Sequence, residues 1–448
     1  MSQIMGKAKI TKITIDVVRP NAAGIDIASE VHYVSVPDDR DTPSVRKFGS
    51  FTEDLHKMAQ WLKQCNIDTV AMESTGIYWI QPYLILEEYG FEVYLVNARH
   101  IKNVSGRKTD VQDCQWIRQL HSYGLLNRSF QPESLTRELR AYMRHRKHLV
   151  QSTSNQILHM QKAFEQMNIK LHDVISDITG QSGMRMIKAI LEGERDANTL
   201  AKLASGRIKA SKDKIAKSLT GVWREEHLFE LKQAFDLYQY LNLKINECDA
   251  QINKVMTRLA SNENSDNIKR HKRTNKNSLH FDGTKYLKQI LGIDVTRIYG
   301  ISEITATEII SEVGADMSKW STEKHFVSWL NLAPNNRTSG EKKLKPKKTN
   351  KRNKAGQAFM LAASTLKNSE HWLGVFYRRI KARHGAGIAV KATARKLSLI
   401  FYKMLKYKIE FDPLSIEAYN QYFREHRLKY VEKQAHALGL KLVPTIVS

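Results

Sequence analysis

The sequence has few cysteines, no long hydrophobic run and fewer acidic than basic residues. Only 3 cysteines occur among 448 residues, far apart and never as a C-x-x-C pair. This argues against a disulfide framework or a zinc site, and we expect each cysteine to be a small core residue. No apolar stretch is long enough to cross a bilayer, and residues 1–12 contain no apolar signal-peptide segment. We therefore expect a cytoplasmic protein.

The shortage of acidic residues leaves the chain strongly basic. It contains 71 Lys and Arg against 46 Asp and Glu, which gives a net charge of +25. Such a balance predicts a polyanionic partner. The 14 Phe, 17 Tyr and 7 Trp are too many for a disordered basic tail, so most of this charge should lie on folded surfaces.

Residues 22–131 show the pattern of an α/β domain. Extended segments are expected at 24–28, 31–36, 44–51, 69–72 and 91–96, and helices at 53–65 and 77–89. A further helix should start at Thr109, because Thr109 and Gln112 form a capping box. This order predicts an antiparallel opening followed by parallel pairing, with the first strand central and the fourth strand beside it.

The rest of the chain is predicted to be mostly helical, which makes the fold class α/β plus α. Apolar residues recur every seven positions over 139–171 and 231–259, as in a coiled coil. The spacing leaves open whether these two long helices pack together or form an arm for self-association. The expected organisation is an extension at 1–21, the α/β domain at 22–131, a helical coiled-coil domain at 132–261, a linker at 262–278, a C-terminal domain at 279–412 and a tail at 413–448.

Four acidic residues of the α/β domain are candidates for chemistry. Asp26 lies in the first strand, Glu73 ends the fourth, and Asp110 and Asp113 share one face of the first turn of the last helix. Singly, each has a structural explanation, because strand edges and first helical turns often carry acids. In the expected strand order they converge, and carboxylates ~4 Å apart repel by roughly 4 kcal/mol, so a cation is needed. Two Mg²⁺ ions with oxygen ligands fit this need and suit phosphodiester chemistry.

Other candidate residues are suited to binding nucleic-acid phosphates. Gly300 lies in a turn before a helix, as in a helix-hairpin-helix element, although Ser302 replaces the expected second glycine and an ordinary helix corner is the alternative. The basic candidates are Arg107, Lys108, Arg337, Lys342, Lys343, Lys345, Lys347, Lys348, Lys351 and Arg352. Such runs track phosphates with salt-dependent affinity, or are solvated loops. A second basic strip, residues 378–396, is interleaved with aromatic residues that are mostly expected in the core.

The motifs Gly-Ile-Asp-Ile, Met-Glu-Ser-Thr-Gly and Lys-Thr-Asp-x-x-Asp, with residues 329–340, resemble the DEDD insertion-sequence transposases, also known as bridge-RNA-guided recombinases. The resemblance extends over nearly the whole chain and implies a RuvC-like, RNase H-type fold for residues 22–131. It implies that Asp26, Glu73, Asp110 and Asp113 hold the metals. It also implies that Ser339 is the nucleophile of the C-terminal transposase domain, brought to the acidic centre from another subunit.

The resemblance also implies a reaction and its partners. The expected protein is a homo-oligomer, a dimer or tetramer, that binds donor and target DNA and a structured noncoding guide RNA near the prokaryotic nucleoid. Cleavage would be Mg²⁺-dependent and pass through a serine-linked DNA ester, which conserves bond energy for strand exchange. Two alternatives are a hydrolytic RuvC-like junction resolvase and a noncatalytic RNA- or DNA-binding scaffold.

Overall fold

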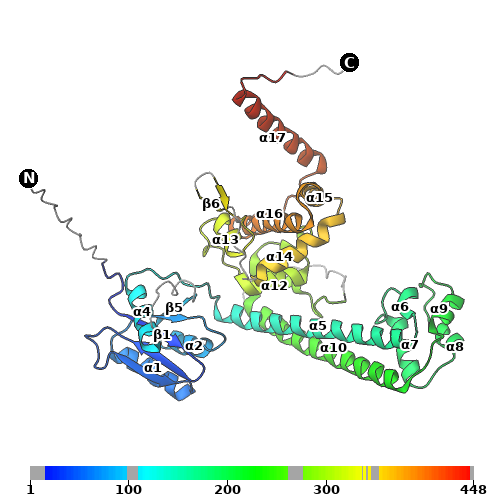
Figure 1. Cartoon of the computed structure of the whole chain (residues 1–448), viewed down its shortest axis with the longest axis horizontal. Coiled ribbons are helices and arrows are strands. Elements are labelled where there is room, and N and C mark those ends of the chain that lie inside the picture. Colours follow the sequence, from blue (N-terminus) through cyan, green and yellow to red (C-terminus); the bar gives the residue numbers. More distant parts are fainter. Residues whose placement is uncertain are drawn as a thin grey trace, which may run out of the picture. The chain divides into compact units, whose positions relative to one another are not determined.

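The structure is a computed structural model of the chain, and it divides into two compact units, one ending at Gln131 and one beginning at Pro132 (Figure 1). It describes residues 16–97, 109–260, 276–334, 337–339, 342–344 and 353–443. Among the helices in these ranges, none combines the length and apolar character that a membrane span requires.

The first unit is built on a five-stranded sheet in the order β3-β2-β1-β4-β5. The strands are β1 (Ala22–Ile27), β2 (Val31–Ser35), β3 (Val45–Gly49), β4 (Thr69–Glu73) and β5 (Glu92–Val96). The first three pair antiparallel, and β4 and β5 join parallel to β1 and to each other. The prediction of a central first strand with the fourth beside it is confirmed.

Helices cover both faces of this sheet (Figure 1). On one face, α1 (Thr52–Gln64) and α2 (Ile80–Glu88) share an apolar core with Ile25 of β1 and Met72 of β4. On the other face, α4 (Asp110–Ser122) packs Ile117 against Ala71 of β4. Because strand residues alternate between faces, the neighbours of Ile25 and Met72 point toward α4.

Two long helices dominate the first part of the second unit. α5 (Ser134–Gln166) and α10 (Glu225–Ala260) pack against each other along their length. Arg146 of α5 and Asp249 of α10 form an ion pair that is almost completely buried. Of the two interpretations left open by the seven-residue spacing, the helices adopt intramolecular pairing, while a supercoil and a role in self-association stay predictions.

A small helical cluster connects the ends of α5 and α10 (Figure 1). Its members are α6 (Leu171–Val174), α7 (Gln181–Leu191), α8 (Ala197–Lys202) and α9 (Lys212–Leu219). They share one apolar core with the adjoining ends of the long helices. Residues 171–219, between the two long helices, therefore form a folded cap.

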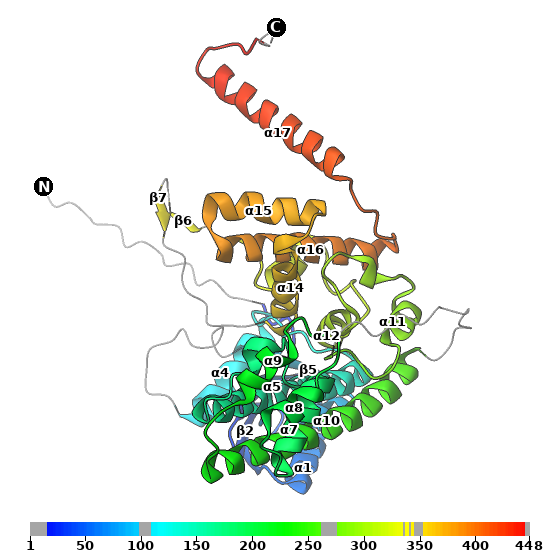
Figure 2. The same cartoon turned by 90° about the vertical axis from the view of Figure 1, so that its right-hand side faces the viewer.

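The second unit continues with a group of shorter helices and one hairpin (Figure 2). These elements are α11 (Gly283–Leu291), η1 (Val295–Arg297), α12 (Glu303–Val313), α13 (Glu323–Trp329), β6 (Arg337–Ser339), β7 (Lys342–Leu344), α14 (Lys354–Thr365), η2 (Leu366–Asn368), α15 (Trp372–His384), α16 (Ala386–Tyr407) and α17 (Ile416–Ala437). Helix α12 is attached to α5 through Glu312, whose carboxylate accepts two hydrogen bonds of 2.8 Å from Arg144. Arg140 donates to the Glu312 carbonyl oxygen at 2.8 Å, at the end of α12 where carbonyls lack helical partners.

Candidate active site

Asp26 and Glu73 lie on neighbouring strands and on the same face of the sheet. Ile25 of β1 is in register with Met72 of β4, and each acid is the next residue along its strand. Ile25 and Met72 are buried beneath α1 and α2, so the two acids point toward α4. Glu73 also accepts a hydrogen bond of 2.9 Å from the hydroxyl of Thr75.

Helix α4 approaches the backbone of β1 closely because residue 24 is glycine. A Cβ atom at Gly24 would lie within 3.0 Å of the Cys114 carbonyl oxygen and the Arg118 amide nitrogen. Arg118 also donates from Nε to the Ser35 hydroxyl of β2 at 3.1 Å. These contacts hold α4 against the strand that carries Asp26.

The first turn of α4 supplies the other two acids. Its N-cap is Thr109, whose side chain accepts a hydrogen bond of 3.3 Å from the backbone N–H of Gln112. The predicted helix start is therefore confirmed, and Asp110 and Asp113 both lie in the first turn. Asp110 is exposed and Asp113 is partly buried.

The four acids are close enough to interact through their charges. Burial of the Asp26 carboxyl raises its pKa from 3.8 to about 6, and the negative charges of Asp113, Asp110 and Glu73 add to this rise. A hydrogen bond from the backbone of Ile27 acts in the opposite direction. The structure thus brings the four predicted acids to one end of the central strand.

The donor chemistry of this cluster fits a hard divalent cation, because carboxylate oxygens are the ligands that Mg²⁺ prefers. Within the described ranges, no group of three or more His, Cys, Asp or Glu side chains could hold a metal ion as it stands. The other three acids therefore repel the charge of Asp26, but the four side chains do not form a complete metal-binding site as they stand.

The expected burial of the three cysteines is confirmed, but the closeness of Cys114 to Asp26 was not foreseen. Cys114 is fully buried in the first half of α4, and its burial together with the charge of Asp26 raises the pKa of the thiol to about 12. With so high a pKa the thiol is neutral near pH 7, which disfavours a role as a nucleophile. Its position four residues after Asp110, on the same helical face, was the available signal.

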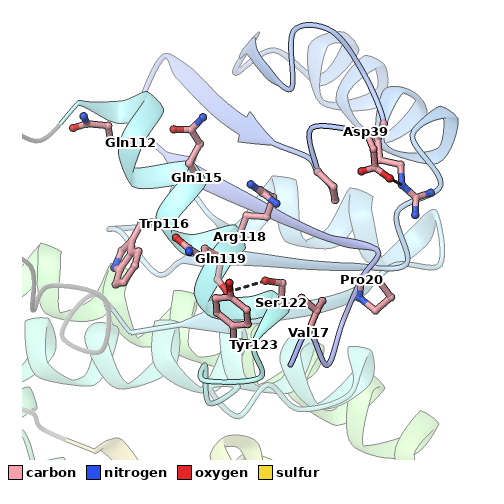
Figure 3. Close-up of a pocket in the computed structure, with 12 residues that line it drawn as sticks. Val17, Pro20, Asp39, Gln112, Gln115, Trp116, Arg118, Gln119, Ser122 and Tyr123 are labelled. Carbon is pink, nitrogen blue, oxygen red and sulfur yellow. Dashed lines mark hydrogen bonds and ion pairs between the residues drawn. The ribbon is translucent and has the colours of Figure 1, made fainter. Parts of the chain in front are cut away.

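A groove of about 700 Å³ runs beside α4 (Figure 3). Five side chains of α4 line this groove: Gln112, Gln115, Trp116, Arg118 and Gln119. None of the four clustered acids lines this groove. It therefore offers amide and guanidinium hydrogen-bonding groups next to the acids rather than containing them.

The other predicted residues belong to the second unit or lie outside the described residues. Ser339 ends β6 and is in register with Lys342 of β7, in a two-stranded hairpin. The backbone positions of Arg337, Ser339, Lys342 and Lys343 are described, but their side chains are not. Outside the described residues lie Arg107, Lys108, Lys345, Lys347, Lys348, Lys351 and Arg352.

Gly300 lies in a tight turn before α12. Its φ of +82° favours glycine, and a Cβ atom there would lie 2.8 Å from the Ala362 carbonyl oxygen of α14. Ser302 caps α12 by accepting a hydrogen bond of 3.3 Å from the Thr305 amide, and Glu303 is the first helical residue. Because the N-terminus already has a side-chain acceptor and an acid, its attraction for phosphate is reduced. Phosphate binding at Gly300 stays a prediction.

Two family models match the chain. One describes DEDD transposases of the IS110 type and matches residues 23–169, which include the four acids. The other describes the transposase IS116/IS110/IS902 family and matches residues 294–378, which include Ser339. A comparison with curated proteins found no match.

Both family models define the same class of protein, a transposase, which is an enzyme that acts on DNA. The cluster of acids and nearly all of the sheet lie within the first matched segment, and the hairpin lies within the second. The chain belongs to the IS110 family of insertion-sequence transposases.

Proposed function

We propose that this transposase cleaves and rejoins DNA at a metal-dependent centre formed by Asp26, Glu73, Asp110 and Asp113. The carrying observation is the pKa of Asp26, which burial and the three other acids raise to about 6. Such crowding of like charges is unfavourable for folding alone and is typical of sites that bind cations. The strand order β3-β2-β1-β4-β5, with three antiparallel strands followed by two parallel ones, supports an RNase H-like, RuvC-like domain.

The acids would serve this chemistry in two groups. Asp26 and Glu73 are carried by adjacent strands, and Asp110 and Asp113 by a capped helical turn, so their backbones are fixed before substrate binds. When bound, Mg²⁺ would neutralise these carboxylates and stabilise charge on the phosphodiester. The chain's own contribution is to hold the oxygen donors on rigid elements.

We further propose Ser339 as the nucleophile. Its hydroxyl oxygen would form a bond to phosphorus while the bond from phosphorus to one deoxyribose oxygen breaks, which releases a DNA hydroxyl. One phosphodiester bond is broken and one is formed. A DNA hydroxyl, either the one released or one from another strand, can therefore attack the serine–DNA ester and reseal a strand without ATP. The match of residues 294–378 to a transposase family supports a role for this segment.

The proposed partners are donor DNA, target DNA and a structured noncoding guide RNA, bound in the cytoplasm by a dimer or tetramer of the chain. The net charge of +25 supports polyanion binding without specifying the polymer. Sequencing the RNA that co-purifies with the protein from its native locus tests this proposal. One structured RNA encoded beside the gene supports guidance, whereas bulk cellular RNA alone counts against it.

Substitutions at Ser339 and Asp26 test the reaction itself. Ser339→Ala should abolish a protein–DNA adduct seen on denaturing gels while leaving DNA binding intact, and Thr338→Ala is the matched control that keeps the adduct. Asp26→Asn should abolish cleavage. Undiminished cleavage by Ser339→Ala would instead favour a hydrolytic nuclease. Unchanged activity of Asp26→Asn would reject the acidic centre.

A further inference from the structure

A second cavity lies in the second unit, between α15, α16 and the residues that precede β6. Its volume of about 450 Å³ is within the range of roughly 300–1,000 Å³ that is usual for small-ligand sites. Its walls include Leu332, Pro334, Phe376 and Leu399. A cavity of this size and lining accepts a flat apolar group.

The same cavity carries positive charge. Lys391, Arg395 and Lys396 all line it, and among the residues that the structure describes no Asp or Glu does. The Nε atom of Arg395 is buried and has no hydrogen-bond partner in the described part of the chain. Burial of the ammonium group and the positive charges of Lys403 and Arg395 lower the pKa of Lys396. The cavity therefore favours an anionic group next to an apolar one.

A nucleotide with its base out of the helical stack combines these two properties. The base is a flat ring that packs against an aromatic side chain such as Phe376, and its phosphate pairs with Lys or Arg. Phe376 is only partly buried, whereas the neighbouring aromatics Tyr377, Phe401 and Tyr402 belong to the core. Unlike these three residues, Phe376 is available for stacking.

We propose that this cavity binds one unstacked base of a nucleic-acid strand, with the adjoining phosphate on Lys391 and Arg395. The inference rests on the proposed function, because it assumes a nucleic-acid substrate or guide. Pro334 of the cavity precedes Ser339 by five residues, and the β6–β7 hairpin lies beside one end of the α15–α16 pair (Figure 2). A base held here fixes the strand near the hairpin that carries Ser339.

Duplexes with a single bulged 2-aminopurine test the proposal, because a bulged base leaves the stack at low energetic cost. Full-length protein is titrated, without divalent metal, with bulged and fully paired DNA duplexes and with the matching RNA duplexes. For DNA, for RNA or for both, we expect the bulged duplex to bind about tenfold more tightly than the fully paired duplex, because one stacked base contributes an effect of that size. Preference for bulged DNA alone identifies the DNA strand as the source, and preference for bulged RNA alone identifies the RNA.

Two variants connect this preference to the cavity. Ala392→Phe fills the cavity and should reduce the preference to less than about twofold, with paired-duplex affinity unchanged. Ala382→Phe, on the exposed surface of α15 outside the cavity, is the matched control and should keep it. Phe376→Leu keeps the apolar wall but removes the ring, and should lower the preference several-fold even if Ala392→Phe fails to fold.

The proposal is overturned if the parent protein shows no preference for either bulged polymer, or if Phe376→Leu and a folded Ala392→Phe both retain it. Because the binding assay contains no metal and requires no cleavage, such a failure leaves the acidic centre and Ser339 untouched. Conversely, full cleavage activity of Asp26→Asn would reject the acidic centre without affecting base binding.

Discussion

Replacing Asp26 by Asn should stabilise the first unit at alkaline pH when no divalent metal is present. The native pKa of Asp26 is about 6, against 3.8 for an unperturbed carboxyl. The native state therefore binds this proton more tightly than the unfolded state, and the free energy of unfolding falls as pH rises from about 4 to about 6. At ~1.36 kcal/mol per pKa unit, ionised Asp26 lowers the free energy of unfolding by up to ~3 kcal/mol at pH values above that range.

The measurement must report on the first unit alone, because the chain has two compact units and one melting temperature does not describe both. Hydrogen exchange of peptides covering β1 and β4, followed by mass spectrometry in the full chain, meets this need. We expect greater protection in Asp26→Asn than in the parent at pH 8 with a chelator, by ~1–3 kcal/mol after allowing for partial solvent screening. The difference should shrink below pH 5, where the native carboxyl is protonated.

Added Mg²⁺ should reverse the order of stability. A cation that binds only the folded parent stabilises it by about 2.7 kcal/mol at a hundredfold excess over Kd, and Asp26→Asn should gain much less. Asp38→Asn, which removes a charge from an exposed site of the same unit, is the control and should change protection by less than ~0.5 kcal/mol. If Asp26→Asn behaves like this control at pH 8, the acids do not repel one another as we infer.

Three further substitutions probe the framework of the two units, two of them in the first unit and one in the second. Gly24→Ala should destabilise the first unit by ~1–3 kcal/mol and reduce cleavage, because its Cβ would push α4 away from β1, as hydrogen exchange of α4 would report. Thr109→Ala should cost about 1 kcal/mol through loss of the α4 cap, measured by urea unfolding followed by exchange. Asp249→Asn should cost ~3–5 kcal/mol because it leaves Arg146 buried without its partner, whereas the double variant Arg146→Met/Asp249→Leu should recover most of that loss in thermal melts of the second unit.

Local sequence patterns predicted much of the first unit, because its elements follow simple periodicities. The capping box at Thr109 located the start of α4, and the expected strand order placed the strands of Asp26 and Glu73 side by side. Element ends were less accurate. Helix α2 begins at Ile80 rather than at residue 77, with Pro82 in its first turn, where a missing backbone N–H is tolerated.

Contacts between distant segments were not accessible from the sequence. The seven-residue repeats indicated two long helices, yet they could not distinguish pairing within one chain from pairing between chains, because both bury the same stripe. The role of Gly24 depends on main-chain atoms of Cys114 and Arg118, about ninety residues away in the chain. The cavity beside β6 similarly combines Pro334 with residues of two later helices.

The attachment of α12 to α5 affects how the protein should be divided for expression. The first family match extends to residue 169 and includes α5, yet α5 belongs to the second compact unit and holds Glu312 through Arg140 and Arg144. A fragment cut at the end of that match would keep α5 but lose both α10 and α12, so its buried face would become exposed and prone to aggregation. A fragment ending at Gln131 avoids this unpartnered helix, so physical boundaries rather than family-match boundaries should guide truncation.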